Sequence, residues 1–162
     1  MKRSSFAKTL TIAAVTALAL GIAPKAKADE GGCSNATLKG AYAYTSTGFN
    51  TAPPAPVGPF AEVGTQTFDG NGKTTGAATL DANGVLIYEV TIKGTYTVNP
   101  DCTGTFTLQV TFPPSSGIGT IPVDVFFATD DSGTEFQAME TDPGAVITRI
   151  GRRQFQGDDW RR

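Results

Sequence analysis

The chain has 162 residues, with 13 basic and 15 acidic side chains, two cysteines and no histidine. Without histidine it cannot by itself form a Ser/His/Asp or Cys/His catalytic group or a histidine zinc site. The composition therefore excludes several large enzyme classes, and we expect no cofactor. It does not define a reaction, and it leaves open whether the protein is an enzyme.

Residues 1–28 are typical of a signal peptide. Three basic residues lie within the first eight positions, residues 10–22 form an apolar run, and residues 26–28 (AKA) supply the small side chains of a cleavage site. The run is shorter than the roughly 20 residues of a membrane-spanning helix, and no later segment is apolar for that long. We therefore expect cleavage after Ala28, no transmembrane segment, and export to the periplasm or the extracellular space.

The charge balance changes once this segment is removed. Residues 29–162 keep eight basic and 15 acidic side chains, a formal charge of −7, and residues 29–148 alone carry −10. Because phosphate binding needs clustered Lys and Arg, we expect no nucleic-acid partner. Residues 29–155 are predicted to form one domain, followed by a basic and aromatic tail at 156–162. That tail has three open interpretations: a solvated end, a contact to anionic lipid or polysaccharide, or a segment folded back onto the acidic domain.

The two cysteines, Cys33 and Cys102, are predicted to form a disulfide. Exported chains meet an oxidising environment, and these residues lie too far apart in sequence for a redox Cys-x-x-Cys pair. Closing a loop of about 70 residues contributes roughly 4 kcal/mol in the chain-entropy model.

The rest of the chain predicts strands. Short runs rich in Thr, Val, Phe and Tyr are separated by Gly, Asn, Asp and Pro, and no convincing helix follows the signal segment. In chain order, the predicted strands are 39–46, 60–68, 73–80, 85–98, 105–112, 122–129, 134–141 and 145–155. Eight strands with mostly short turns favour a single antiparallel meander closed into a β-barrel, because closure removes the sheet edges. A β-sandwich is the alternative, since the links 53–59 and 113–120 are long enough to cross between sheets.

Strict alternation predicts which side chains face the core. In 85–98 the residues Leu86, Tyr88, Val90, Ile92, Tyr96 and Val98 share one face, with Gly94 as a predicted bulge or bend. Glu89 lies on the opposite face and is expected to be solvated. In 122–129 both faces are apolar, because Phe126 and Ala128 lie opposite Val123. A partner subunit in a homo-oligomer, or the C-terminal segment, would cover this outer face.

Glu62 is the candidate catalytic residue. In 60–68 it shares one face with Phe60, Gln66 and Phe68. If this face points inward, a buried carboxylate must be paired or bind a ligand, which suits a general base or an anchor. In the alternative, Ala61 and Val63 point inward and Glu62 is solvated.

An eight-stranded barrel is either filled by side chains or wide enough for one small ligand. The predicted ligand-binding residues are Phe60, Gln66, Tyr88, Phe106 and Phe127. Two acidic turns, 69–73 and 130–135, contain possible cation ligands, but the first lacks the spacing of a calcium loop and both are better explained as turns. We therefore predict no metal site.

Five segments together resemble a group of largely uncharacterised exported bacterial proteins. They are 33–42 (CSNATLKGAY), 58–64 (GPFAEVG), 68–72 (FDGNG), 94–104 (GTYTVNPDCTG) and 141–144 (TDPG). That group is similar to the barrel domain related to allene oxide cyclase, a relative of the lipocalin-type (calycin-like) barrels. The resemblance implies the fold and an apolar interior. It does not transfer the cyclase activity, because the catalytic residues of that enzyme have no matching positions here.

Three functions follow as alternatives. The first is an exported barrel that binds a small apolar or amphipathic molecule. The second is a cofactor-free isomerase or cyclase with Glu62 as the base. The third is a structural or adhesive cell-envelope protein with a filled barrel.

Overall fold

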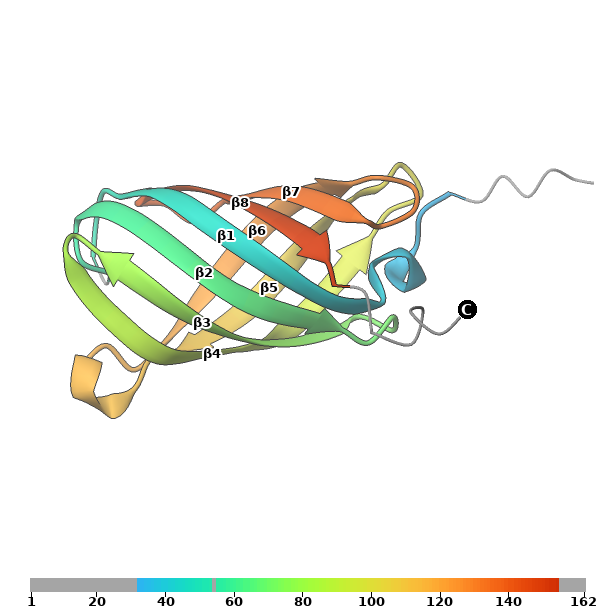
Figure 1. Cartoon of the computed structure of the whole chain (residues 1–162). Coiled ribbons are helices and arrows are strands. Elements are labelled where there is room, and N and C mark those ends of the chain that lie inside the picture. Colours follow the sequence, from blue (N-terminus) through green and yellow to red (C-terminus); the bar gives the residue numbers. More distant parts are fainter. Residues whose placement is uncertain (1–31, 54, 155–162) are drawn as a thin grey trace, which may run out of the picture. The chain divides into compact units, whose positions relative to one another are not determined.

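A computed structural model describes residues 32–53 and 55–154, so the predicted signal peptide and the tail at 156–162 lie outside the described residues. Eight antiparallel strands follow one another around a closed barrel, in which the last strand pairs with the first (Figure 1). The strands are β1 Gly40–Asn50, β2 Gly58–Phe68, β3 Lys73–Ala82, β4 Val85–Val98, β5 Thr103–Thr111, β6 Thr120–Thr129, β7 Glu135–Glu140 and β8 Ala145–Arg153. The predicted barrel is confirmed, and the sandwich alternative is wrong.

Only short helices occur in the described part of the chain: two 3₁₀ turns, η1 Asn35–Leu38 and η2 Pro114–Ser116. Within the same residues, no helix has the length and apolar character needed to cross a lipid bilayer.

Alternation of side chains produces the barrel core. Along β5 the residues Phe106, Leu108 and Val110 are buried, while the threonines between them are exposed. Since successive strand residues point to opposite faces, one face of each strand fills the interior and the other meets solvent. β1 and β8 close the cylinder in continuous register from Tyr42 opposite Arg153 to Asn50 opposite Ala145.

β4 departs from this alternation. Its register against β3 shifts where Tyr88 and Glu89 together oppose Thr79, and Glu89 adopts a positive φ of 58°. This is a β-bulge, which reverses the phase of the strand. Ile87 and Val90 therefore both point inward, although they lie an odd number of residues apart.

The bulge corrects two predictions from the sequence. Leu86 and Tyr88 do not share the inner face with Val90, because they lie before the bulge and are 52% and 60% exposed. Gly94 is not the bulge, since it pairs in regular register with Leu108. A Cβ at Gly94 would lie 2.3 Å from the carbonyl oxygen of Thr107, so glycine is needed there for close approach of the strands. The prediction that Glu89 is exposed is confirmed.

The two ends of the barrel differ. We call one end, on the right in Figure 1, the closed end; it consists of η1 and the turns after β2, β4 and β6. We call the other the open end; it consists of the β1–β2 link, the β3–β4 turn, η2 and the β7–β8 turn. Each strand therefore contributes residues to a closed half and to an open half of the interior.

Aromatic rings fill the closed half. This aromatic cluster comprises Tyr42, Phe68, Tyr96, Phe106, Phe127 and Phe136. Phe106 and Phe127 stack with ring centroids 4.4 Å apart, and Phe68 meets its neighbours mostly edge to face. Such pairs add roughly 0.5–1.5 kcal/mol each beyond the burial of their area.

η1 covers this end of the barrel and is held there by several bonds. Tyr96 Oη donates to the carbonyl oxygen of Asn35 at 2.9 Å, and Asn35 Oδ1 accepts from the backbone N–H of Val98 at 2.8 Å. The predicted disulfide is confirmed: Cys33 joins Cys102, with Cα atoms 4.9 Å apart. The segment before β1 is therefore covalently joined to the β4–β5 turn.

Candidate ligand site in the open half

Neighbouring strands place buried polar side chains at the middle of the barrel. In the register of the sheet, Ser46 on β1 lies opposite Glu62 on β2 and opposite Arg149 on β8. All three side chains point inward, as do Tyr44 and Gln66. We call these five residues the polar cluster.

Glu62 lies at the centre of the polar cluster and accepts three hydrogen bonds. Its Oε1 accepts from Tyr44 Oη at 3.0 Å, and its Oε2 accepts from Ser46 Oγ at 2.9 Å and from Arg149 Nη2 at 3.1 Å. The alternative in which Glu62 meets solvent is wrong, since Glu62 is 8% exposed and Val63 on the opposite face is 59% exposed.

Arg149 is the charge partner that a buried carboxylate requires. Its Nε donates to Ser46 Oγ at 3.0 Å, its Nη1 donates to Gln66 Oε1 at 3.3 Å, and its guanidinium lies 4.3 Å from the centroid of the Tyr44 ring. The pair is therefore held in one geometry from several sides, and its two charges cancel.

The rest of the polar cluster is also satisfied. Gln66 Nε2 donates to Thr74 Oγ1 at 3.1 Å, and that hydroxyl donates to the carbonyl oxygen of Thr67. Burial raises the pKa of Tyr44, and the nearby carboxylate of Glu62 raises it further. Tyr44 thus remains a neutral hydrogen-bond donor.

An inner cavity of about 60 Å³ lies beside the polar cluster on its open-end side. Its apolar walls come from Ala55, Phe60, Leu80, Val110, Phe112, Ile121, Val123 and Ile147, and its polar groups come from Asn50, Glu62, Glu140 and Arg149. Since a water molecule occupies about 30 Å³ in the liquid, the cavity is large enough for a small polar head group and no more.

Two polar side chains of this cavity lie outside the polar cluster. Asn50 ends β1, is 6% exposed, and its Nδ2 has no hydrogen-bond partner among the described residues. Glu140 ends β7, and burial, together with the charge of Asp142, raises its pKa from 4.5 to about 7. The cavity therefore contains an unpaired donor and a carboxyl group close to its titration point at neutral pH.

A second space, the rim pocket, continues the inner cavity toward solvent. It measures about 220 Å³ and shares Asn50, Ala55, Ile121 and Glu140 with the cavity. The β1–β2 link and the β7–β8 turn form its outer wall. Together the two spaces approach the size of the smallest ligand pockets, about 300 Å³.

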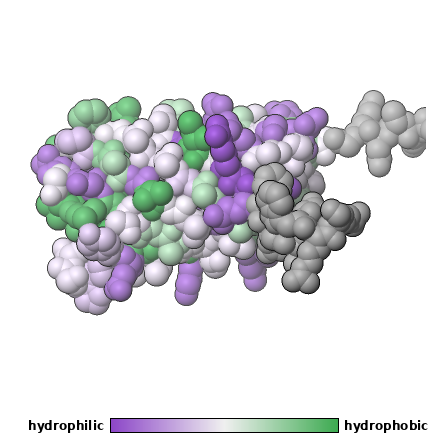
Figure 2. Space-filling model, in the orientation of Figure 1, coloured by the Kyte–Doolittle hydropathy of each residue, from purple (hydrophilic) through white to green (hydrophobic). Residues whose placement is uncertain are grey.

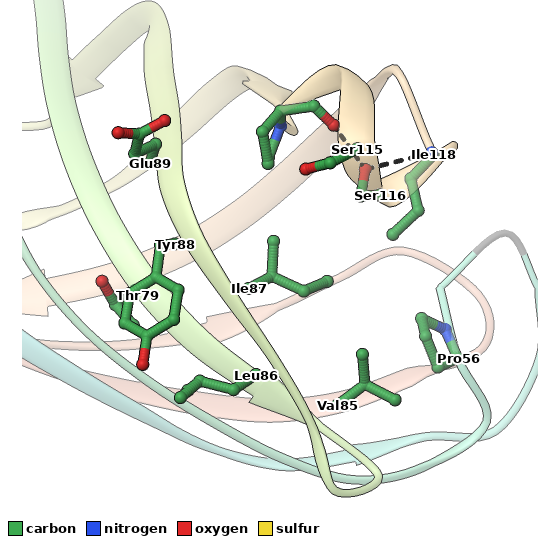
Figure 3. A pocket seen from close by; sticks show the side chains of 11 residues that line it. Pro56, Thr79, Val85, Leu86, Ile87, Tyr88, Glu89, Ser115, Ser116 and Ile118 are labelled. Atoms are coloured by element: carbon green, nitrogen blue, oxygen red, sulfur yellow. Dashed lines mark hydrogen bonds between the residues drawn. The ribbon is translucent and has the colours of Figure 1, made fainter.

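A wider lateral groove of about 950 Å³ lies nearby, between the first residues of β4 and η2. Figure 3 shows Ile87 and Ile118 on its two sides, with Leu86 and Tyr88 directed away from η2. The groove exists because β4 pairs with β5 only from Thr91 onward. Residues 85–90 of β4 therefore have no paired strand on the β5 side.

The structure brings some of the predicted ligand residues to this site and places others elsewhere. Phe60 lines the inner cavity, and Gln66 belongs to the polar cluster. Phe106 and Phe127 point inward but pack in the aromatic cluster of the closed half. Tyr88 lies outside the barrel wall, because of the bulge, and borders the lateral groove. A ligand-binding role for each of these residues stays a prediction.

Several polar residues of the site were not predicted from the sequence, among them Arg149, Asn50 and Glu140. Arg149 was not singled out, although its spacing from Ile147 on β8 indicates an inward position. Asn50 lies four residues beyond the predicted end of its strand, and Glu140 was not singled out.

The catalytic role proposed for Glu62 also stays a prediction. Three donors occupy three of the roughly four acceptor positions of its carboxylate, which leaves little of it free to take a proton from a substrate.

The acidic turns have structural roles. Asp69 Oδ1 accepts from the backbone N–H groups of Asn71 and Lys73, and Asp130 Oδ1 accepts from Thr134 in the same way. The backbone N–H groups of Lys73 and Asn71 lower the pKa of Asp69. Among residues 32–53 and 55–154, no three Asp, Glu, Cys or His side chains group as metal ligands.

The geometry defines a closed eight-stranded antiparallel barrel with one filled half and one partly hollow half. No family model and no curated protein matches the sequence. Among solved structures, a redesigned β-barrel is similar, with a TM-score of 0.50 and 21% sequence identity over 75% of this chain and 95% of that one. This likeness supports the fold alone, and the resemblance to the allene oxide cyclase group stays a prediction.

Proposed function

We propose that the protein binds a small amphipathic molecule in the open half of its barrel. The polar head enters the inner cavity, and the apolar part lies in the rim pocket. The observation that carries this proposal is the buried Nδ2 of Asn50, which has no partner among the described residues and lines a cavity whose walls are mainly apolar. A buried donor without a partner is costly, and a bound acceptor would remove that cost.

The surface around the open end supports an apolar ligand body. In Figure 2 hydrophobic residues gather at this end, on the left of the view. Its exposed apolar side chains include Phe49, Val57, Val85, Leu86 and Val146. Single exposed apolar residues are common, but a group beside a cavity is typical of a binding surface.

Export is part of the proposal. The Cys33–Cys102 disulfide supports it, because disulfides persist in oxidising compartments. The mass of the protein purified from its native source tests it: cleavage after Ala28 gives a chain that begins at Asp29. An uncleaved chain recovered from the cytoplasm would contradict export.

Binding can be tested with N-phenyl-1-naphthylamine, a neutral probe that fluoresces in apolar sites. Ile147 lines the inner cavity, whereas Ile150, further along β8, is 47% exposed on the outside. We expect Ile147→Phe to fill the cavity and to weaken probe binding at least tenfold, while Ile150→Phe binds like the unmodified protein. Circular dichroism must show that both variants are folded.

Two results would overturn this proposal. A folded, unmodified protein that binds neither the probe nor any extractable lipophile would favour the structural or adhesive alternative. Equal binding by the unmodified protein and both variants would place the probe outside the open half.

A further inference from the structure

The polar groups of the inner cavity differ in what they can offer to a ligand. Glu62 and Arg149 are bonded to each other and to the rest of the polar cluster, and their charges cancel. Asn50 Nδ2 is a donor without a partner, and Glu140 is a carboxyl group for which the described residues provide no salt bridge. Asn50 and Glu140 are therefore the polar groups of the cavity that are available to bind the head group of a ligand.

Both side chains lie where a head group would meet them together. They line the inner cavity and also the rim pocket, and each stands at the last residue of its strand, at the open end. Neither strand neighbours the other, since β8 lies between β1 and β7. A molecule that passes from the rim pocket into the cavity thus has an amide donor on one side and a carboxyl oxygen on the other.

We propose that the ligand, bound at the site of the proposed function, carries a hydroxyl head that accepts from Asn50 Nδ2 and donates to Glu140. A hydroxyl group is a single small group that is both donor and acceptor. It fits a cavity of about 60 Å³, and it adds no charge to an interior where the pair of Glu62 and Arg149 is already neutral. The ligand class is an aliphatic or alicyclic alcohol.

Charged heads fit less well. A carboxylate would face Glu140, Asp142 beside it, and Glu62, while the guanidinium of Arg149, which also lines the cavity, already has a carboxylate partner. An ammonium group would gain the Glu140 carboxyl group as a partner, but it would share the cavity with Arg149 and, having no acceptor, would leave Asn50 Nδ2 unpaired. Like charges in a poorly hydrated space repel more strongly than they do in water.

The experiment compares 1-decanol, decanoate and decylamine as competitors of N-phenyl-1-naphthylamine at pH 7. We expect 1-decanol to bind at least tenfold more tightly than either charged compound. Asn50→Leu should weaken 1-decanol at least tenfold more than it weakens the probe, because the probe carries no hydroxyl head. Thr47→Leu, an exposed change on the same strand, is the matched control and should alter neither affinity.

Glu140 is tested by two substitutions. Glu140→Gln keeps an acceptor oxygen and should change 1-decanol affinity less than threefold, whereas Glu140→Leu should reduce it about tenfold. If the probe and all three decyl compounds fail to bind, the proposed function itself is wrong. If they bind but the alcohol has no advantage, or Asn50→Leu has no effect, the site stands and the hydroxyl head is wrong.

Discussion

The two halves of the barrel are built from the same strands but contain different chemistry. β2 contributes Phe68 to the aromatic cluster and Glu62 to the polar cluster, six residues earlier on the same inner face. The closed half is packed with rings and covered by η1, whereas the open half has a neutralised ion pair, an unpaired amide and a cavity. Packing of the rings within the closed half holds the strands in place. The open half can therefore retain an unpaired amide and a cavity, although both reduce stability.

The largest expected effect tests the closed half. Phe106→Ala should remove a stacked, fully buried ring and lower the free energy of unfolding by about 3–5 kcal/mol. Tyr88→Ala is the control, because this tyrosine is exposed, and it should change stability by roughly 0.5 kcal/mol or less. Urea denaturation followed by circular dichroism measures both. Similar losses in the two variants would contradict the assignment of the core to the closed half.

The next test addresses the ion pair of the open half, Glu62 with Arg149. Arg149→Met leaves Glu62 buried without a charge partner and should cost about 3–5 kcal/mol. Adding Glu62→Gln to that variant removes the uncompensated charge, so the double variant should recover much of the loss. A double variant no more stable than Arg149→Met would show that the pair is not coupled as the distances indicate.

The disulfide provides a third comparison. The double substitution Cys33→Ser and Cys102→Ser should lower stability by about 2–4 kcal/mol, because the open loop regains conformational freedom in the unfolded state. The disulfide lies at the closed end, so probe affinity at the open end should change less than twofold once the variant is folded. A selective loss of probe binding would show that the two ends are coupled.

The smallest expected effect is a pH dependence from Glu140. Because its pKa is raised from 4.5 to about 7 in the folded protein, its contribution to stability is complete below pH 4.5 and is lost as the pH rises through 7. Relative to Glu140→Gln, the unmodified protein should lose on the order of 1–2 kcal/mol over this range, a value reduced for partial exposure. A loss of the same size in Glu140→Gln would contradict the raised pKa of Glu140.

The fold was predictable from the sequence because turns and alternation are local signals. Acidic and glycine-rich turns such as 69–72 mark strand ends, and the strict alternation of β5 identifies its buried face. The same reasoning failed in β4, since a bulge is a property of two paired strands, and Tyr88 and Glu89 carry no local mark of it.

The site was predictable only in part. Glu62 could be identified as a carboxylate in phase with two phenylalanines, but its partner Arg149 lies 87 residues away and is brought beside it by barrel closure. Asn50 gains its significance from burial at a strand end, and both Asn50 and Glu140 gain theirs from a shared cavity, neither of which is encoded in a short segment. Contacts between side chains on strands that are distant in sequence could therefore be identified only from the structure.

The central claim is that ligand enters the open half and leaves the closed half unchanged. Backbone amide chemical shifts during a titration with 1-decanol test it directly. The account predicts the largest shifts at Asn50, Glu140 and Ile147, with small ones at Phe68, Phe106 and Phe127. Shifts centred on the aromatic cluster or confined to the lateral groove would contradict it. An absence of shifts at 1-decanol concentrations that displace the probe would contradict it as well.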